Sequence, residues 1–185
     1  MPKQKVDERY VVKQSLKVFR SKGYNHTSMQ DIADACELQK GSLYHYFKSK
    51  EALMHAVIEY MHTYFTREAF KHAYDETLGN KQKLQILADI CETQYFTSES
   101  GCLFGNLALE TAGTIPELSS MVKDFFTEWV NALQHIFSSK FDAATAQTMA
   151  QDSLAEIEGA VMMMRIFNDR NYLRRANARI VAKID

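Results

Sequence analysis

The chain has 185 residues, with 22 Lys and Arg against 23 Asp and Glu, so its formal net charge is −1 and it is not a uniformly basic nucleic-acid coat. The N-terminus is polar and no apolar run approaches the ~18 residues of a membrane span, which argues against a secretion signal and against membrane insertion. Three cysteines, an odd number, predict reduced thiols and a cytoplasmic location.

Seven glycines and two prolines leave few breaks, and no segment alternates as a strand does, so the sequence predicts an all-helical protein of about nine helices. The first helix is expected over about 5–22 and ends at Gly23. Two short helices follow, one capped by Thr27 with Gln30 returning a bond, and one over 40–47. A longer helix capped by Ser49 is expected to run to about residue 77.

The two short helices and the break at 36–38 have the layout of a helix-turn-helix, whose second helix enters the DNA major groove. Leu43 and Phe47 are four residues apart and share the buried face of that second helix. The other faces are left with groups that suit phosphate oxygens and base edges. Residues 1–60 hold 10 Lys and Arg against 7 Asp and Glu, whereas the rest of the chain holds 12 against 16, so the positive charge gathers around this motif.

The residues that follow a known family pattern are Gly23, Tyr24, Thr27, Ser28, Asp31, Ile32, Ala33, Lys40, Gly41, Ser42, Leu43, Tyr44, His45, Tyr46, Phe47, Ser49, Lys50 and Glu51. Through these residues the first third of the chain resembles the TetR family of bacterial transcriptional regulators. The resemblance implies an N-terminal three-helix helix-turn-helix domain, placed at 5–65, and a helical effector-binding and dimerisation domain, placed at 66–185. It also implies double-stranded operator DNA as a partner.

Ten residues are the expected DNA-binding set: Thr27, Ser28, Gln39, Lys40, Gly41, Ser42, Tyr44, His45, Tyr46 and Lys50. Two positions depart from the commonest family pattern. Glu37 stands where Gly is usual, so a left-handed turn there would carry modest strain. Gln39 replaces the usual Ser or Thr, which weakens the helix cap but supplies an amide suited to reading adenine.

In the rest of the chain, helices are expected over about 81–98, between Gly101 and Gly113, from residue 116, from a cap at Asp142 to about 167, and over about 170–184. The helix of 142–167 is apolar on two adjoining faces. One face covers the core of the chain, and the second needs either the same core or a partner. The family resemblance favours a homodimer that reads two half-sites. The expected interface residues are Leu154, Ile157, Val161, Met164 and Ile180.

Bulky side chains cluster in the middle of the chain, where most are expected to be core and a subset to line a pocket for a small apolar effector. The candidates are Tyr95, Phe96, Cys102, Phe104, Met121, Phe125 and Trp129. Cys102 lies near a helix start, a position that favours the thiolate, although a free cysteine is more often a small buried residue. Gly101, Cys102 and Leu103 followed by Glu110 resemble the branch containing the N-ethylmaleimide reductase repressor, which implies sensing of electrophiles.

Other groups of residues give little support for a metal site or a catalytic site. His55, Glu59 and His62 share a helix face, but nothing else supports a metal, and neither a metal nor a cofactor is expected. No phosphate-binding loop, dinucleotide fingerprint or nucleophile elbow occurs, so an enzyme is not expected. The predicted function is a ligand- or stress-responsive repressor. The alternative is a helical protein-interaction module that keeps the helix-turn-helix fold without binding an operator.

Overall fold

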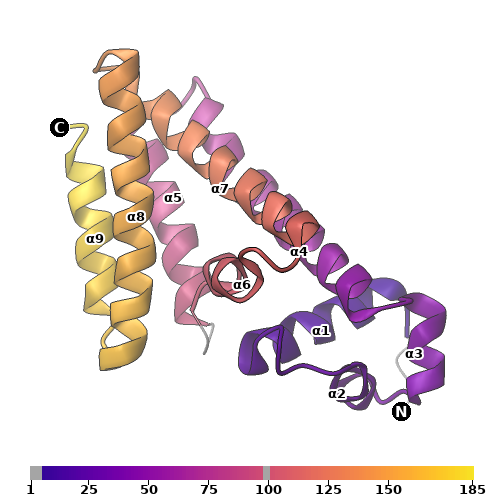
Figure 1. Ribbon diagram of the computed structural model, residues 1–185. Helices are drawn as coiled ribbons and strands as arrows, with labels where there is room; N and C mark the ends of the chain where they lie inside the picture. The colour runs from indigo at the N-terminus through magenta and orange to yellow at the C-terminus, as the bar shows by residue number, and fades with distance from the viewer. Residues whose placement is uncertain (1–5, 98–100) are drawn as a thin grey trace, which may run out of the picture. The chain divides into compact units, whose positions relative to one another are not determined.

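The computed structural model describes residues 6–97 and 101–185, and within these ranges the chain is all-helical without a strand, as predicted (Figure 1). The elements are α1 (Glu8–Lys22), α2 (Met29–Ala35), α3 (Lys40–Tyr46), α4 (Lys50–Glu68), the 3-10 helix η1 (Phe70–Tyr74), α5 (Asn80–Phe96), α6 (Leu103–Thr111), α7 (Pro116–Phe137), α8 (Ala143–Phe167) and α9 (Asn171–Ala182). The helix start expected at residue 5 and the helix end expected at 98 lie outside the described residues. None of the described helices combines the length and the apolar character that a membrane crossing requires.

The fourth helix is shorter than expected, because α4 ends at Glu68 and not near residue 77. The backbone leaves α-helical geometry at Ala69, with φ −114° and ψ −66°, and continues as η1. This change of pitch turns Phe70 inward, where it is buried and stacks on Phe65 with ring centroids 6.0 Å apart. A continuous α-helix would place residue 70 on a different face from residue 65. Burial of this aromatic pair therefore accompanies the break.

The chain divides into two compact units, and both α4 and α7 run through the division. The N-terminal unit comprises the described residues through Met61 together with Leu103–Val122, and the C-terminal unit comprises His62–Cys102 and Lys123–Asp185. The segment Leu103–Val122, with α6 and the start of α7, thus belongs to the unit that carries the helix-turn-helix. The two continuous domains expected from the sequence do not include this return of the chain.

In the N-terminal unit, the apolar stripes of the short helices pack into one core. Val12, Leu16 and Phe19 of α1 are buried, as their spacing predicts, and so are Leu43 and Phe47 around α3. Helix α2 packs against both α1 and α3. The apolar side of α3 is therefore fixed, which leaves its opposite side for solvent or DNA.

In the C-terminal unit, α9 packs against both α5 and α8 (Figure 1). Helix α8 begins at the expected cap, since the Asp142 carboxylate accepts hydrogen bonds from the backbone N–H groups of Ala144 and Thr145, both at 3.1 Å. It ends at Asn168, whose left-handed φ of +50° stops the helix. Four buried rings, those of Phe65, Phe70, Phe125 and Trp129, form an aromatic cluster with centroid separations between 5.3 and 6.0 Å.

Candidate nucleic-acid interface

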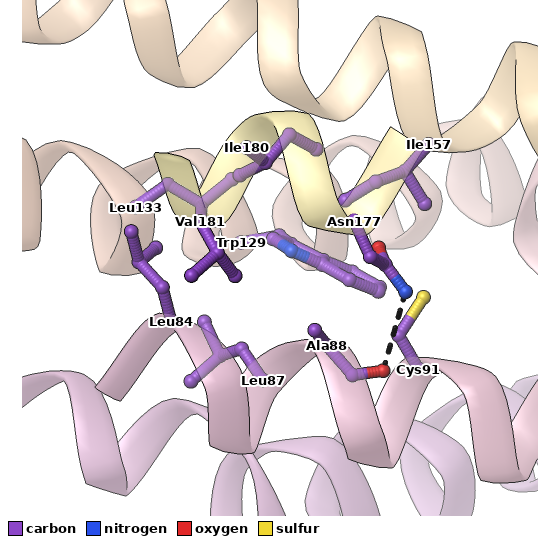
Figure 2. Close-up of a pocket in the computed structure, with 10 residues that line it drawn as sticks. All are labelled: Leu84, Leu87, Ala88, Cys91, Trp129, Leu133, Ile157, Asn177, Ile180 and Val181. Carbon is purple, nitrogen blue, oxygen red and sulfur yellow. Dashed lines mark hydrogen bonds between the residues drawn. The ribbon is translucent and has the colours of Figure 1, made fainter. Parts of the chain in front are cut away.

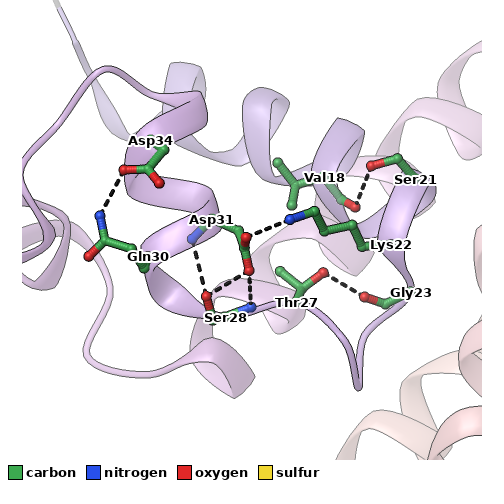
Figure 3. A network of polar contacts seen from close by, with 9 residues as sticks. All are labelled: Val18, Ser21, Lys22, Gly23, Thr27, Ser28, Gln30, Asp31 and Asp34. Atoms are coloured by element: carbon green, nitrogen blue, oxygen red, sulfur yellow. Dashed lines mark hydrogen bonds and ion pairs between the residues drawn. The ribbon is translucent and has the colours of Figure 1, made fainter.

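The start of α2 is held by a reciprocal cap between Ser28 and Asp31 (Figure 3). The Ser28 hydroxyl accepts from the Asp31 N–H at 3.2 Å, and the Asp31 carboxylate accepts from the Ser28 N–H at 2.8 Å. Lys22 of α1 donates to the same carboxylate at 2.5 Å. These bonds, first from Lys22 and then from Ser28, hold the pKa of Asp31 well below its usual range. The cap lies one residue later than expected, and its partner is Asp31 and not Gln30.

Thr27, the expected cap and a candidate phosphate contact, faces inward. Its side chain is buried, and its hydroxyl donates to the Gly23 carbonyl at 2.6 Å. The side chain therefore fastens the turn after α1 and is not presented on the surface, which corrects its assignment to the DNA-binding set.

The turn between α2 and α3 depends on a residue with positive φ. Glu37 has φ +55°, the left-handed conformation foreseen at this position. Directly after it, the Leu38 N–H donates to the Ala33 carbonyl at 2.9 Å and closes the turn. Cys36 is buried beneath, and burial raises the pKa of its thiol to about 11. This cysteine is a packing residue.

Helix α3 presents an exposed face made of Lys40, Gly41, Tyr44 and His45, preceded by the exposed Gln39. Gln39 makes no side-chain cap to the helix, as its residue type predicts, so its amide is not bound to the α3 backbone. Leu43 at 0% exposure fixes the rotation of the helix. The structure thus brings five of the ten predicted DNA-binding residues onto one surface, with Ser42 half-buried beside them.

Tyr46 and Lys50, also in the predicted DNA-binding set, make hydrogen bonds within the chain. The Tyr46 hydroxyl donates to the Val6 carbonyl at 3.1 Å. The Lys50 ammonium donates to the Tyr24 carbonyl at 2.8 Å and lies 4.3 Å from the centroid of the Tyr24 ring. Burial lowers the pKa of Lys50. Both residues are half-buried, and these contacts join segments of the N-terminal unit.

Helix α6 contacts the turn between α1 and α2, a feature that the sequence did not reveal. The Glu110 carboxylate accepts from the Asn25 N–H at 2.7 Å. At Gly23, with φ +79°, a Cβ atom would lie only 2.8 Å from the Glu110 carboxylate. The positive φ therefore favours glycine at this position, and a side chain there would also require the Glu110 carboxylate to shift.

The seven candidate effector residues are divided between the two compact units. Phe104 and Met121 lie in the N-terminal unit, and the other five lie in the C-terminal unit. Of these five, Phe125 and Trp129 belong to the aromatic cluster. Phe96 packs under two guanidinium groups, those of Arg170 at 4.9 Å and Arg174 at 5.2 Å.

Tyr95 and Cys102 form a separate polar site with Glu158. The Tyr95 hydroxyl donates to the Cys102 sulfur at 3.4 Å and lies 3.5 Å from the Glu158 carboxylate. Burial raises the pKa of Glu158, and hydrogen bonds from Cys102 and Tyr95 offset part of that rise. Cys102 is buried directly before α6, and its thiol serves as a donor to a carboxylate.

A small cavity of about 10 Å³ lies within the C-terminal unit, between α5, α7, α8 and α9 (Figure 2). It is lined by Leu84, Leu87, Ala88, Cys91, Trp129, Leu133, Ile157, Asn177, Ile180 and Val181. Of the seven effector candidates, Trp129 is the one that reaches it. The other nine lining residues lie on α5, α7, α8 and α9. No local sequence pattern groups them, because the apolar spacing of each helix predicts only a buried face.

The expected dimer residues are mostly inside the chain. Ile157, Val161, Met164 and Ile180 are at most 5% exposed, and Leu154 is half-buried. These four fill the core of the C-terminal unit, which corrects the choice of helix face. The large apolar side chains that α8 exposes are Met162, Ile166 and Phe167.

The histidines of α4 have ordinary partners. His62 bonds to the Glu128 carboxylate at 2.5 Å, whereas His55 lies 3.8 Å from Glu117. Within 6–97 and 101–185, no group of three His, Cys, Asp or Glu side chains is arranged to hold a metal ion.

Comparison with known proteins agrees with this geometry. Residues 11–57 match the family described as bacterial regulatory proteins, tetR family, and residues 81–179 match the LmrA/YxaF-like transcriptional regulator C-terminal domain. The HTH-type transcriptional repressor DhaR of Mycobacterium sp. (strain GP1) is 29% identical over 171 residues, which is 89% of this chain and 85% of that protein.

Two solved structures share the fold. A TetR transcriptional regulator from Legionella pneumophila superposes with a TM-score of 0.90 at 23% identity, over 99% of this chain and 100% of the other. The reduced form of NemR from E. coli gives 0.79 at 18% identity, with 94% of each chain covered. The chain therefore belongs to the TetR family and is a DNA-binding transcriptional regulator with an LmrA/YxaF-like C-terminal domain, not an enzyme.

Proposed function

We propose that this regulator is a cytoplasmic repressor that binds a near-palindromic operator as a homodimer and releases it when a small effector binds. The observation that carries the proposal is the exposed face of α3, with Lys40, Gly41, Tyr44 and His45 outward over a buried Leu43. The proposal of repression, as opposed to activation, is supported by the relative DhaR, which is named as a transcriptional repressor.

The chemistry of α3 suits the major groove. The Lys40 ammonium suits a phosphate oxygen. The Gln39 side-chain amide makes no cap to α3, and its donor and acceptor match those of an adenine edge. A Cβ atom at Gly41 would meet nothing within 4 Å in the protein itself. Internal packing therefore gives no reason for a glycine there, whereas close approach of a DNA backbone does.

The homodimer is supported by one face of α8. Met162, Ile166 and Phe167 are 57%, 64% and 57% exposed, which is unusual for large apolar side chains of one helix end. On the same helix, a Cβ atom at Gly159 would meet nothing within 4 Å. An open glycine beside exposed methionine and isoleucine permits close packing of a second helix. A two-fold pair of α8 helices then places two copies of α3 for two half-sites.

For the effector, a molecule that binds without covalent chemistry is favoured over an electrophile that modifies Cys102. The Cys102 sulfur is buried and hydrogen-bonded by Tyr95 beside the Glu158 carboxylate. Burial of the sulfur limits the access of an electrophile to it. Replacement of Cys102 by Ser should therefore leave release by the natural effector unchanged.

The experiment selects operator fragments from random DNA with the purified protein and then measures affinity by fluorescence anisotropy over a range of salt concentrations. Lys40→Ala should weaken binding and flatten the salt dependence by about one charge. Lys71→Ala is the matched control, because Lys71 is an exposed lysine of the other unit. Sedimentation of the protein–DNA complex gives the number of chains bound.

Failure to enrich any sequence, with a folded protein, would favour the alternative of a protein-interaction module. Selection of a site without two-fold symmetry, bound by one chain, would contradict the dimeric operator complex. Equal effects of Lys40→Ala and Lys71→Ala would contradict the assignment of α3 as the recognition helix.

A further inference from the structure

The cavity of the C-terminal unit is lined by uncharged and mostly aliphatic side chains. Its ten lining residues come from four helices and include no Asp, Glu, Lys, Arg or His. Seven are aliphatic, and the polar side-chain atoms belong to Trp129, Asn177 and Cys91, beside the Ala88 carbonyl oxygen that accepts from Asn177 (Figure 2). Such a lining accepts a neutral apolar molecule. It rejects an anion or cation, because a charge buried without a partner is strongly disfavoured.

Trp129 brings an unsatisfied donor to this wall. Its side chain is 2% exposed, and its indole Nε1–H has no hydrogen-bond partner among the described residues. An unpaired buried donor is destabilising, so native structures rarely keep one without a reason. Indole nitrogen is a donor only, and the missing partner must therefore be an acceptor atom.

Asn177 links two of the helices around the cavity. Its side-chain nitrogen donates to the Ala88 carbonyl at 3.4 Å and to the Glu92 carboxylate at 3.1 Å, so it joins α9 to α5 beside the empty space. A molecule that widens the cavity strains these two hydrogen bonds between α9 and α5. The position of α9 relative to α5 is thus coupled to occupation of the site.

We propose that this cavity is the binding site of a small neutral molecule that is mostly apolar and carries one acceptor oxygen, as an ether, ketone, ester or alcohol does. The indole N–H of Trp129 donates to that oxygen, and the aliphatic walls enclose the remainder. The inference rests on the proposed function in one respect, namely that this ligand is the effector, while its binding can be measured without DNA.

The size of the cavity determines how binding acts. About 10 Å³ is room for one water molecule, so a larger ligand must move the walls. Close-packed helices change between discrete arrangements and do not yield continuously. The ligand therefore stabilises a more open arrangement of α5 and α9, which is the differential binding that a switch requires.

The test uses tetrahydrofuran and cyclopentane, two rings of nearly equal shape of which one has an acceptor oxygen. Trp129 is the single tryptophan of the chain, so its fluorescence reports on this site alone. Wild-type protein should show a saturable change in emission and a rise in melting temperature with tetrahydrofuran. In Trp129→Phe the affinity for tetrahydrofuran relative to cyclopentane, measured by melting temperature, should fall about tenfold.

Ala88→Val is a second variant that fills the cavity and keeps Trp129, and it should lose the response to both rings. No saturable response in the wild type overturns the site, as does an unchanged preference in Trp129→Phe. Operator affinity measured in parallel separates the two proposals. Binding of tetrahydrofuran without loss of operator affinity supports the site and counts against its role as the effector site. If tetrahydrofuran still releases the operator from both Trp129→Phe and Ala88→Val, the effector site lies elsewhere, and the proposal that this cavity is the effector site is overturned.

Discussion

The Glu110 carboxylate accepts a hydrogen bond from the backbone N–H of Asn25 at 2.7 Å, although the two residues are 85 positions apart in the chain. The contact fastens α6 to the turn that precedes α2, within the same compact unit as the recognition helix. Helix α6 is therefore part of the DNA-binding unit, and a displacement of α6 acts directly on the turn that orients α2.

Glu110→Ala removes this acceptor and should lower the free energy of unfolding by about 1 kcal/mol, the usual worth of such a bond. Glu110→Gln keeps an acceptor oxygen and should cost less. Urea denaturation measures both, and amide exchange at Asn25 should accelerate in the alanine variant. Glu59→Ala, at an exposed position of the same unit, is the control. A Glu110→Ala protein with unchanged Asn25 exchange would show that the contact is not formed in solution.

Lys50→Met should reduce stability more than it reduces operator affinity. The Lys50 ammonium donates to the Tyr24 carbonyl and lies over the Tyr24 ring, so its loss removes both contacts and leaves that carbonyl with the Thr27 N–H at 3.3 Å. The expected cost is about 1–2 kcal/mol of unfolding free energy. Thermal melting and anisotropy at a temperature where the variant is folded separate the two effects. An affinity loss as large as that of Lys40→Ala, without a change in melting, would instead place Lys50 on the DNA.

Gly41→Ala should leave the fold intact and weaken operator binding. A Cβ atom at this position meets nothing within 4 Å, and alanine favours an exposed helix by about 1 kcal/mol over glycine. The variant is therefore expected to melt at the same or a higher temperature. Its operator affinity should fall because the added methyl group occupies the space of an approaching DNA backbone. Unchanged affinity would mean that α3 does not approach DNA at residue 41.

Met162→Glu and Val161→Glu are adjacent substitutions with opposite expected outcomes. Met162 is 57% exposed, whereas Val161 is 2% exposed. Met162→Glu should give a folded protein that sediments as a monomer and binds the operator weakly. Val161→Glu buries an unpaired charge, costs several kcal/mol in order of magnitude, and should unfold or aggregate. A dimeric Met162→Glu protein would remove this face of α8 from the interface.

Glu158→Gln should stabilise the protein at neutral pH. Burial raises the pKa of Glu158 in the folded state, so folding binds a proton more tightly than the unfolded chain does. Stability of the wild type then declines as the pH rises above about 4.5 towards the raised pKa. The amide variant lacks this decline, and the two proteins should converge in melting temperature near pH 4. An equal pH dependence of both proteins would contradict a raised pKa.

Much of the fold and of the DNA-binding surface followed from local patterns. Apolar spacing placed Leu43 and Phe47 on the buried side of α3, and this assignment also determined that Lys40, Tyr44 and His45 face outward. The Asp142 cap and the left-handed Glu37 were equally local, because each depends on residues within one or two helical turns. Such features are determined by short-range backbone geometry, which the sequence displays directly.

Tertiary structure decided which polar residues turn inward and which apolar face is free. Lys50 and Tyr46 could be assigned only after their partners, Tyr24 and Val6, were seen to lie beside them, 26 and 40 positions away. Helix α8 is apolar on two faces, and periodicity does not say which one α5 and α9 cover. The return of α6 to the N-terminal unit and the cavity beside Trp129 are likewise products of packing between distant segments. Spacing along a helix determines which side chains share a face, whereas contacts between helices determine what that face meets.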